Sequence, residues 1–182
     1  MSLPLDGETK YAPMIARRLI HVIAVPKETH YFWAKSRAEA ARFVAIEKGD
    51  LAMQPVGIID DDAAIRDSLR VLLRARGIDA HCFASAAEFL GSAEVDQLGS
   101  LLVDQHMPNM SGIELVELLR SRKVVTPAIM LTGASDPQLA KRAKNAGVLA
   151  ILHKPVSGAE LMGWIRLAFI AGSADKPHAE LQ

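Results

Sequence analysis

The stretch LLVDQHMPNMSG, residues 101–112, is an apolar run that ends on one carboxylate, Asp104, and then breaks into a loop containing proline. A strand interior excludes unpaired charge, so Asp104 is predicted to lie where a buried strand emerges into a solvated crevice. The residues MPNMSG favour a turn, and Ser111 followed by Glu114 has the pattern of a capping box that begins a helix. The stretch therefore predicts a strand, a loop and a helix, with an aspartate at the bend.

Similar apolar runs occur on both sides of this one, and amphipathic stretches separate them. The runs are VGIID (56–60), IDAHCF (78–83), PAIML (127–131) and LAILH (149–153). Such alternation is typical of repeated strand–helix units around a parallel sheet. We therefore predict an α/β domain with five strands and five helices over residues 56–172.

Capping signals give the helices their expected ends. Gly77 and Gly147 are predicted to end the first and fourth helices. Ser85 and Ser157 each precede a glutamate by three residues and are expected to begin helices, and Pro137 fits a first helical turn. Asp62, before two alanines, is expected to be a helix N-cap.

Residues 1–50 differ from the rest of the chain and predict a small ββα unit of unknown role. Residues 1–55 hold five of the nine aromatic residues. A unit this small is rarely stable alone, so we expect it to pack on the larger domain or to pair with another chain. Residues 51–55 are predicted to be a linker, and residues 173–182 a polar tail.

Composition excludes several classes of protein. Lys plus Arg and Asp plus Glu number 21 each, so no global charge recruits nucleic acid or an anionic membrane. A single cysteine, Cys82, cannot form an internal disulfide, and no apolar run is long enough for a membrane span. We expect a cytoplasmic protein. After Gly172 the given residues hold only the polar stretch SADKPHAELQ, which could be a tail or the start of a linker to an output domain, so nucleic acid is not an expected partner of these residues.

Polar residues follow four of the five predicted strands. Because parallel strands end at one edge of the sheet, Asp60, Asp61, Asp104, Thr132 and Lys154 are expected to lie together. Clustered carboxylates suit Mg²⁺, whose remaining ligands can be waters and phosphate oxygens. The hydroxyl and the ammonium could then bind a phosphoryl group, with Asp104 either a third metal ligand or the nucleophile. The sequence has no glycine-rich turn or P-loop, so nucleotide binding is not predicted.

This order of residues resembles the receiver domain of two-component response regulators, over residues 56 to about 172. The resemblance implies a flavodoxin-like doubly wound fold with strand order 2-1-3-4-5. It also implies that Asp104 takes a phosphoryl group from a histidine kinase or a histidine phosphotransfer protein and switches a surface for a downstream partner. The chain would not be an enzyme beyond self-catalysed phosphoryl transfer and hydrolysis.

The resemblance also assigns a role to each residue of the cluster. Mg²⁺ would be held by three carboxylates and one backbone carbonyl, those of Asp60, Asp61, Asp104 and His106. Thr132 and Lys154 would bind phosphoryl oxygens, and the bond before Pro155 would be cis. Receivers usually switch through the threonine and an aromatic residue three positions before the lysine, but that position is Ile151 here. The switch formed by Thr132 and Ile151 is therefore expected to differ.

The last predicted helix is apolar on more than one side. Leu161, Trp164, Ile165 and Ala168 form a stripe that would face the core, while other apolar side chains lie off it: Met162, Phe169 and Ile170. These three residues could border the core, form a dimer face or dock the N-terminal unit. In receivers the last two helices commonly form the partner surface, so a homodimer through them is one candidate.

Two rival functions remain open. A haloacid-dehalogenase-type phosphatase also uses an aspartyl phosphate, but it needs a second aspartate two residues after the first, where this chain has His106. The second rival is a receiver-like interaction module that works without phosphorylation, which Ile151 permits.

Overall fold

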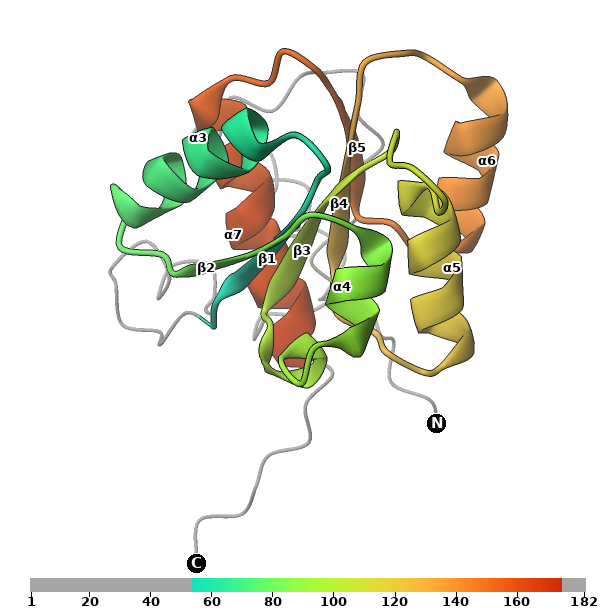
Figure 1. The fold of residues 1–182 in the computed structure, drawn as a ribbon, viewed down its shortest axis with the longest axis horizontal. Coiled ribbons are helices and arrows are strands. Elements are labelled where there is room, and N and C mark those ends of the chain that lie inside the picture. Colours follow the sequence, from blue (N-terminus) through green and yellow to red (C-terminus); the bar gives the residue numbers. More distant parts are fainter. Residues whose placement is uncertain (1–53, 175–182) are drawn as a thin grey trace, which may run out of the picture.

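The computed structural model describes residues 54–174, which form a five-stranded parallel sheet with helices on both faces (Figure 1). The strands are β1 (Val56–Ile59), β2 (Ala80–Phe83), β3 (Ser100–Asp104), β4 (Ala128–Thr132) and β5 (Ala150–His153). Their spatial order is β2-β1-β3-β4-β5, and every neighbouring pair is parallel. The predicted fold and strand order of the larger domain are confirmed.

The helices form two outer layers. One face of the sheet carries α3 (Ala63–Arg74) and α7 (Gly158–Ala174), and the other carries α4 (Ala86–Gly91), α5 (Gly112–Ser121) and α6 (Pro137–Asn145) (Figure 1). A short 3₁₀ helix, η1 (Val95–Gln97), precedes β3 and was not predicted. The three layers leave the carboxyl ends of the strands open at one edge.

The strand side chains alternate between two cores. Ile58 and Leu102 pack with α3 and α7, whereas Ile59, Leu101 and Val103 pack with α4 and α5. Both sets are buried, because helices cover both faces of the sheet. This double burial explains why the strands read as continuous apolar runs rather than as alternating ones.

The predicted helix ends are found where the caps indicated. Asp62 accepts hydrogen bonds from the amides of Ala64 and Ile65, at 2.8 and 3.4 Å, and is the N-cap of α3. Gly77 and Gly147, after α3 and α6, have φ angles of +73° and +65°, which glycine adopts without a Cβ penalty.

The other predicted parts of the chain fall mainly outside the described residues. The ββα unit (1–50), most of the linker (51–55) and the end of the polar tail (173–182) lie there. Helix α7 continues to Ala174, two residues past the predicted domain end. Gly172 does not stop the helix; a Cβ on it would lie 3.3 Å from both the Gly99 carbonyl oxygen and Pro127, so the glycine permits close packing. Within residues 54–174, no helix combines the length and apolar character of a membrane span.

An exposed ion pair links α5 to α6. Arg142 donates to both carboxylate oxygens of Glu117, at 2.9 and 2.6 Å. The hydrogen bond from Arg142 is the main cause that lowers the pKa of Glu117 from its ordinary value of 4.5. A carboxyl group with a lowered folded-state pKa stabilises the fold above the unfolded pKa, and this stabilisation is lost as the pH falls through the folded value.

We therefore expect the Glu117→Gln variant to melt about 1–3 °C below the wild type at neutral pH, because exposed pairs contribute little. The difference should shrink as the pH falls from 4.5 through the lowered pKa of Glu117 in the folded state, where the wild-type carboxylate also becomes protonated. Melting curves from pH 3 to 7, measured beside the exposed control Asp96→Asn, test this. A difference that persists unchanged at pH 3 would contradict it.

Candidate functional site

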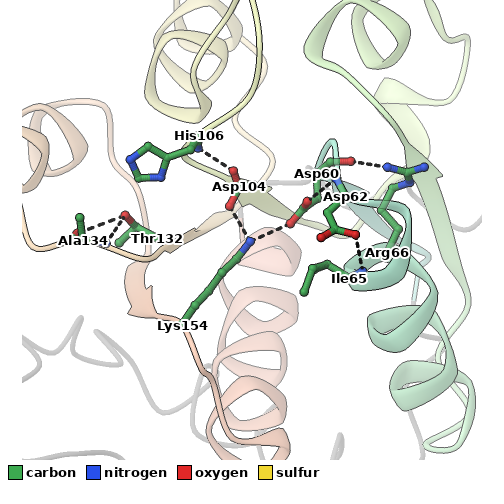
Figure 2. Close-up of polar contacts among 9 residues, drawn as sticks. All are labelled: Asp60, Asp62, Ile65, Arg66, Asp104, His106, Thr132, Ala134 and Lys154. Carbon is green, nitrogen blue, oxygen red and sulfur yellow. Dashed lines mark hydrogen bonds and ion pairs between the residues drawn. The ribbon is translucent and has the colours of Figure 1, made fainter.

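Four polar side chains lie at the carboxyl edge of the sheet, each positioned by a different strand, and three of them are in contact (Figure 2). Asp60 follows β1, Asp104 ends β3, Thr132 ends β4 and Lys154 follows β5. The side chains of Asp60, Asp104 and Thr132 belong to residues at most 5% exposed, although each is polar. Buried polar groups need partners, so their contacts define the site.

Lys154 bridges the two buried carboxylates. Its Nζ lies 3.0 Å from Asp60 Oδ2 and 2.7 Å from Asp104 Oδ1 (Figure 2). Burial alone would lower the pKa of Lys154, but hydrogen bonds and charges from Asp104 and Asp60 outweigh burial and raise it. The ammonium is therefore charged at neutral pH and offsets part of the repulsion between the carboxylates. The Lys154–Pro155 peptide bond is cis.

Backbone amides orient the same carboxylates. The Asp62 amide donates to Asp60 Oδ1 at 2.9 Å, and the His106 amide donates to Asp104 Oδ2 at 2.6 Å. Arg66 Nη1 donates to the carbonyl oxygen of Asp60 at 2.7 Å. The sequence analysis did not identify Arg66 as part of the site. The signal that could have found it is its position six residues after Asp60, in the helix that follows β1.

The loop after Asp104 is closed by Gln105, which was also missed. The Gln105 amide donates to the Leu131 carbonyl at 2.8 Å, and its own carbonyl accepts from the Gly112 amide at 3.2 Å. Its side-chain oxygen accepts from the Ile113 amide at 3.1 Å. The loop is thus fastened to β4 at its start and to α5 at its end, which fixes the backbone beside Asp104.

Gly112 sits where the loop returns to the strand, and it has no room for a side chain. A Cβ on Gly112 would overlap the carbonyl oxygen of Asp104, and would lie 3.0 Å from the carbonyl carbon. Both atoms belong to backbone, which cannot rotate away. We expect Gly112→Ala to destabilise the fold by about 1–3 kcal/mol, because overpacking forces a backbone shift.

Urea denaturation of Gly112→Ala and of Gly91→Ala measures this effect. Gly91 ends α4 and has nothing within 4 Å of its added Cβ, so its substitution should be close to neutral. Equal stabilities of the two variants would show that the loop accommodates the methyl group.

Thr132 and Ile151, the two predicted switch residues, have different surroundings. The Thr132 hydroxyl donates to the Ala134 carbonyl at 3.1 Å and lies 3.3 Å from the Ala134 amide (Figure 2). It is therefore bonded to its own loop rather than to Lys154. Ile151 is half-buried and packs against the cluster formed by α5, β4 and α6.

Asp61 completes the acidic set and is exposed, beside the buried Asp60. The two buried carboxylates of Asp60 and Asp104 share one ammonium, that of Lys154, so together they carry more negative than positive charge. A divalent cation would balance them, and the oxygen donors are those that Mg²⁺ prefers. No three His, Cys, Asp or Glu side chains among residues 54–174 form a ready metal cage, so water would supply much of the coordination shell. The donor set fits Mg²⁺ on these terms.

Comparisons with known proteins find similarity to response regulators and their receiver domains. A family model described as the response regulator receiver domain matches residues 56–166. Response regulator protein TodT of Pseudomonas putida is 36% identical over 111 residues, which are 61% of this chain and 49% of that protein. Transcriptional regulatory protein FixJ of Azorhizobium caulinodans is 36% identical over 126 residues, which are 69% and 59% of the two chains. The chain thus spans about half the length of the curated relatives it matches.

Solved structures give the same result. A CheY-like response regulator receiver domain protein from Methanospirillum hungatei superimposes with a TM-score of 0.62 at 28% identity, over 69% of this chain and all of that one. The structure titled FixJ-N gives a TM-score of 0.59 at 32% identity, over 65% and 95% of the two chains. The residues that the family model matches, 56–166, hold the whole sheet and its helices as far as the first half of α7.

Proposed function

Because the chain belongs to the response regulator receiver domain family of two-component systems, we propose that its Asp104 accepts a phosphoryl group from a histidine kinase or a histidine phosphotransfer protein. The observation that carries this proposal is the bridge from Lys154 to Asp60 and Asp104 at the open edge of the sheet. In this arrangement the buried carboxylate of Asp104 is held by the His106 amide and the Lys154 ammonium, and the carboxylate of Asp60 lies on the other side of the ammonium.

The transfer would proceed by direct attack of the carboxylate. An oxygen of Asp104 forms a bond to phosphorus while the bond between phosphorus and the donor's imidazole nitrogen breaks. The imidazole nitrogen keeps the electron pair of the broken bond and takes up a proton from water. Lys154 stays charged and pairs with a phosphoryl oxygen, which offsets the negative charge that the acyl phosphate adds.

Mg²⁺ is the proposed cofactor. The carboxylates of Asp60, Asp61 and Asp104 and the carbonyl oxygen of His106 would hold it, and the ion would supply positive charge against the phosphoryl oxygens. Asp60 would keep its amide bond from Asp62, which fixes the carboxylate's orientation.

Phosphorylation would be communicated through Thr132. Its hydroxyl now bonds the Ala134 backbone, so binding a phosphoryl oxygen would exchange those bonds and move the loop before α6. The half-buried Ile151 beside α5 and α6 would adjust its packing instead of swinging an aromatic ring. A downstream protein, or a second copy bound through α6 and α7, would then bind the phosphorylated and unphosphorylated surfaces with different affinities.

The first experiment is intact-protein mass spectrometry after incubation with acetyl phosphate and Mg²⁺. We expect a gain of one phosphoryl group, and no gain when a chelator removes the metal. No gain in the presence of Mg²⁺, for a chain with a normal circular dichroism spectrum, would overturn the proposal.

One observation favours a second candidate, an interaction module that does not depend on phosphorylation. Ile151 packs into the apolar cluster of α5, β4 and α6 and has neither a ring nor a hydroxyl to reorient. Binding of a downstream partner with equal affinity to the phosphorylated and unphosphorylated chains would support this candidate. Sustained turnover of a phosphomonoester would instead favour the phosphatase, although His106 occupies the position of its general acid.

A further inference from the structure

Asp60 is held through its backbone as well as through its carboxylate. Its amide donates to the Phe83 carbonyl of β2 at 3.2 Å, and its carbonyl oxygen accepts from Arg66 Nη1 at 2.7 Å. Figure 2 shows the side chain of Arg66 reaching back from α3 to that oxygen. The chain is therefore fixed at the residue where it leaves β1, by the neighbouring strand and by the helix that follows.

Asp61, the next residue, has no comparable support for its side chain. It is exposed, and its carboxylate makes no hydrogen bond or ion pair with any residue in 54–174. The direction of this carboxylate therefore depends on the direction of the backbone. Because the peptide group between Asp60 and Asp61 is planar, a bond that fixes the Asp60 carbonyl also fixes the plane that leads into the Cα of Asp61. Arg66 makes that bond.

The helix alone does not explain an arginine at position 66. Arg66 lies close to the start of α3, where the helix dipole disfavours a cation. Arg70, one turn later, bonds the carboxylate of Asp67 at 2.8 Å, whereas Arg66 pairs with no carboxylate in the described part of the chain. Arg66 is half-buried, and its guanidinium is used on the Asp60 carbonyl. Its contacts thus point to the site rather than to the helix.

We propose that Arg66 is a positioning residue for the Mg²⁺ site, which holds the Asp60–Asp61 peptide so that the Asp61 carboxylate is directed toward the ion. The inference rests on the proposed function, in which Asp61 is a metal ligand. Arg66 itself does not contact the ion. Its positive charge opposes the binding of another cation, whereas its hydrogen bond favours binding by orienting a ligand. The two effects of Arg66 on Mg²⁺ affinity therefore have opposite signs.

Arg66→Gln separates the two effects, because it removes both the charge and the bond. Loss of charge alone would strengthen Mg²⁺ binding. Loss of positioning should weaken it, and we expect a dissociation constant about tenfold higher, at the lower end of the effects of groups that orient metal ligands. The matched control Arg70→Gln removes one charge from the same helix and should bind Mg²⁺ as tightly as the wild type or slightly more tightly.

Titration of the ¹⁵N-labelled full chain with MgCl₂, without a phosphoryl donor, measures these affinities. The amide shifts of Asp61 and His106 report on binding, and a dispersed spectrum shows that each variant is folded. Arg66→Lys keeps the charge but offers a single ammonium on a differently shaped side chain, so it should also bind Mg²⁺ more weakly than the wild type. It serves as the test if Arg66→Gln does not fold.

Equal or tighter binding by Arg66→Gln, or wild-type binding by Arg66→Lys, would overturn the inference. Urea denaturation without Mg²⁺ provides a second readout, since a merely structural role would lower stability and leave the Mg²⁺ affinity unchanged. Unchanged affinity in a folded Arg66→Gln leaves the proposed function standing. Absence of Mg²⁺ binding by the wild type would instead overturn both the proposed cofactor and the role of Arg66.

Discussion

Asp104→Asn should abolish phosphorylation by acetyl phosphate, because an amide oxygen is too weak a nucleophile to attack phosphorus. The substitution keeps the shape of the side chain, and its oxygen can still accept from the His106 amide or from Lys154. Lys154 also keeps its partner Asp60, so no charge is left buried alone. We therefore expect the variant to fold like the wild type and to lose only its ability to be phosphorylated. Intact mass after incubation with the donor and Mg²⁺ measures it.

The matched control is Asp67→Asn. Asp67 is exposed on α3 and pairs only with Arg70 in the described part of the chain, so this variant should be phosphorylated like the wild type. Phosphorylation of Asp104→Asn at the wild-type level would mean that another residue is the acceptor. In that case peptide mapping of the modified chain would locate it.

The sheet and its open edge could be predicted because their signals are local. A run such as SLLVD is recognised as a strand from its length and apolar composition alone. Asp62 and Gly77 mark the two ends of one helix through backbone groups only a few residues away. Parallel strands then bring their carboxyl ends to one edge, which is why Asp60, Asp104 and Lys154 were expected together. The bridge from Lys154 to both carboxylates was not predicted, because the sequence analysis assigned the ammonium to a phosphoryl oxygen.

Other features depend on contacts that no periodicity records. Arg66 and Gln105 bind backbone groups that only the folded loops bring within reach. Helix α7 continues two residues past Gly172, the predicted domain end, and the close contact of Gly172 with Gly99 is not visible in the sequence. Likewise, the sequence left three explanations for Met162, Phe169 and Ile170, and the structure packs all three into the core cluster that the sheet forms with α3 and α7.

Lys154→Met should combine a loss of stability with a loss of phosphorylation. The thioether keeps most of the side-chain volume but removes the charge that bridges Asp60 and Asp104, whose side chains are 2% and 6% exposed. Two buried carboxylates then face each other without compensation. Since the lysine itself is 30% exposed, we expect a decrease of roughly 1–3 kcal/mol in the free energy of unfolding, below the full value for a buried pair. Phosphorylation should slow by about a hundredfold, because the charge that stabilises the transferring group is gone.

Two further measurements identify electrostatics as the cause. Mg²⁺ should stabilise Lys154→Met more than the wild type, because the ion replaces the missing positive charge between the same carboxylates. The stability deficit should also shrink as the pH falls, since protonation of either carboxylate removes the repulsion. Lys144→Met, at an exposed position on α6, controls for loss of one charge and should show neither effect. A deficit in Lys154→Met that is insensitive to both Mg²⁺ and pH would point to lost packing of the lysine stem, and the bridge would then have little part in holding the acidic site.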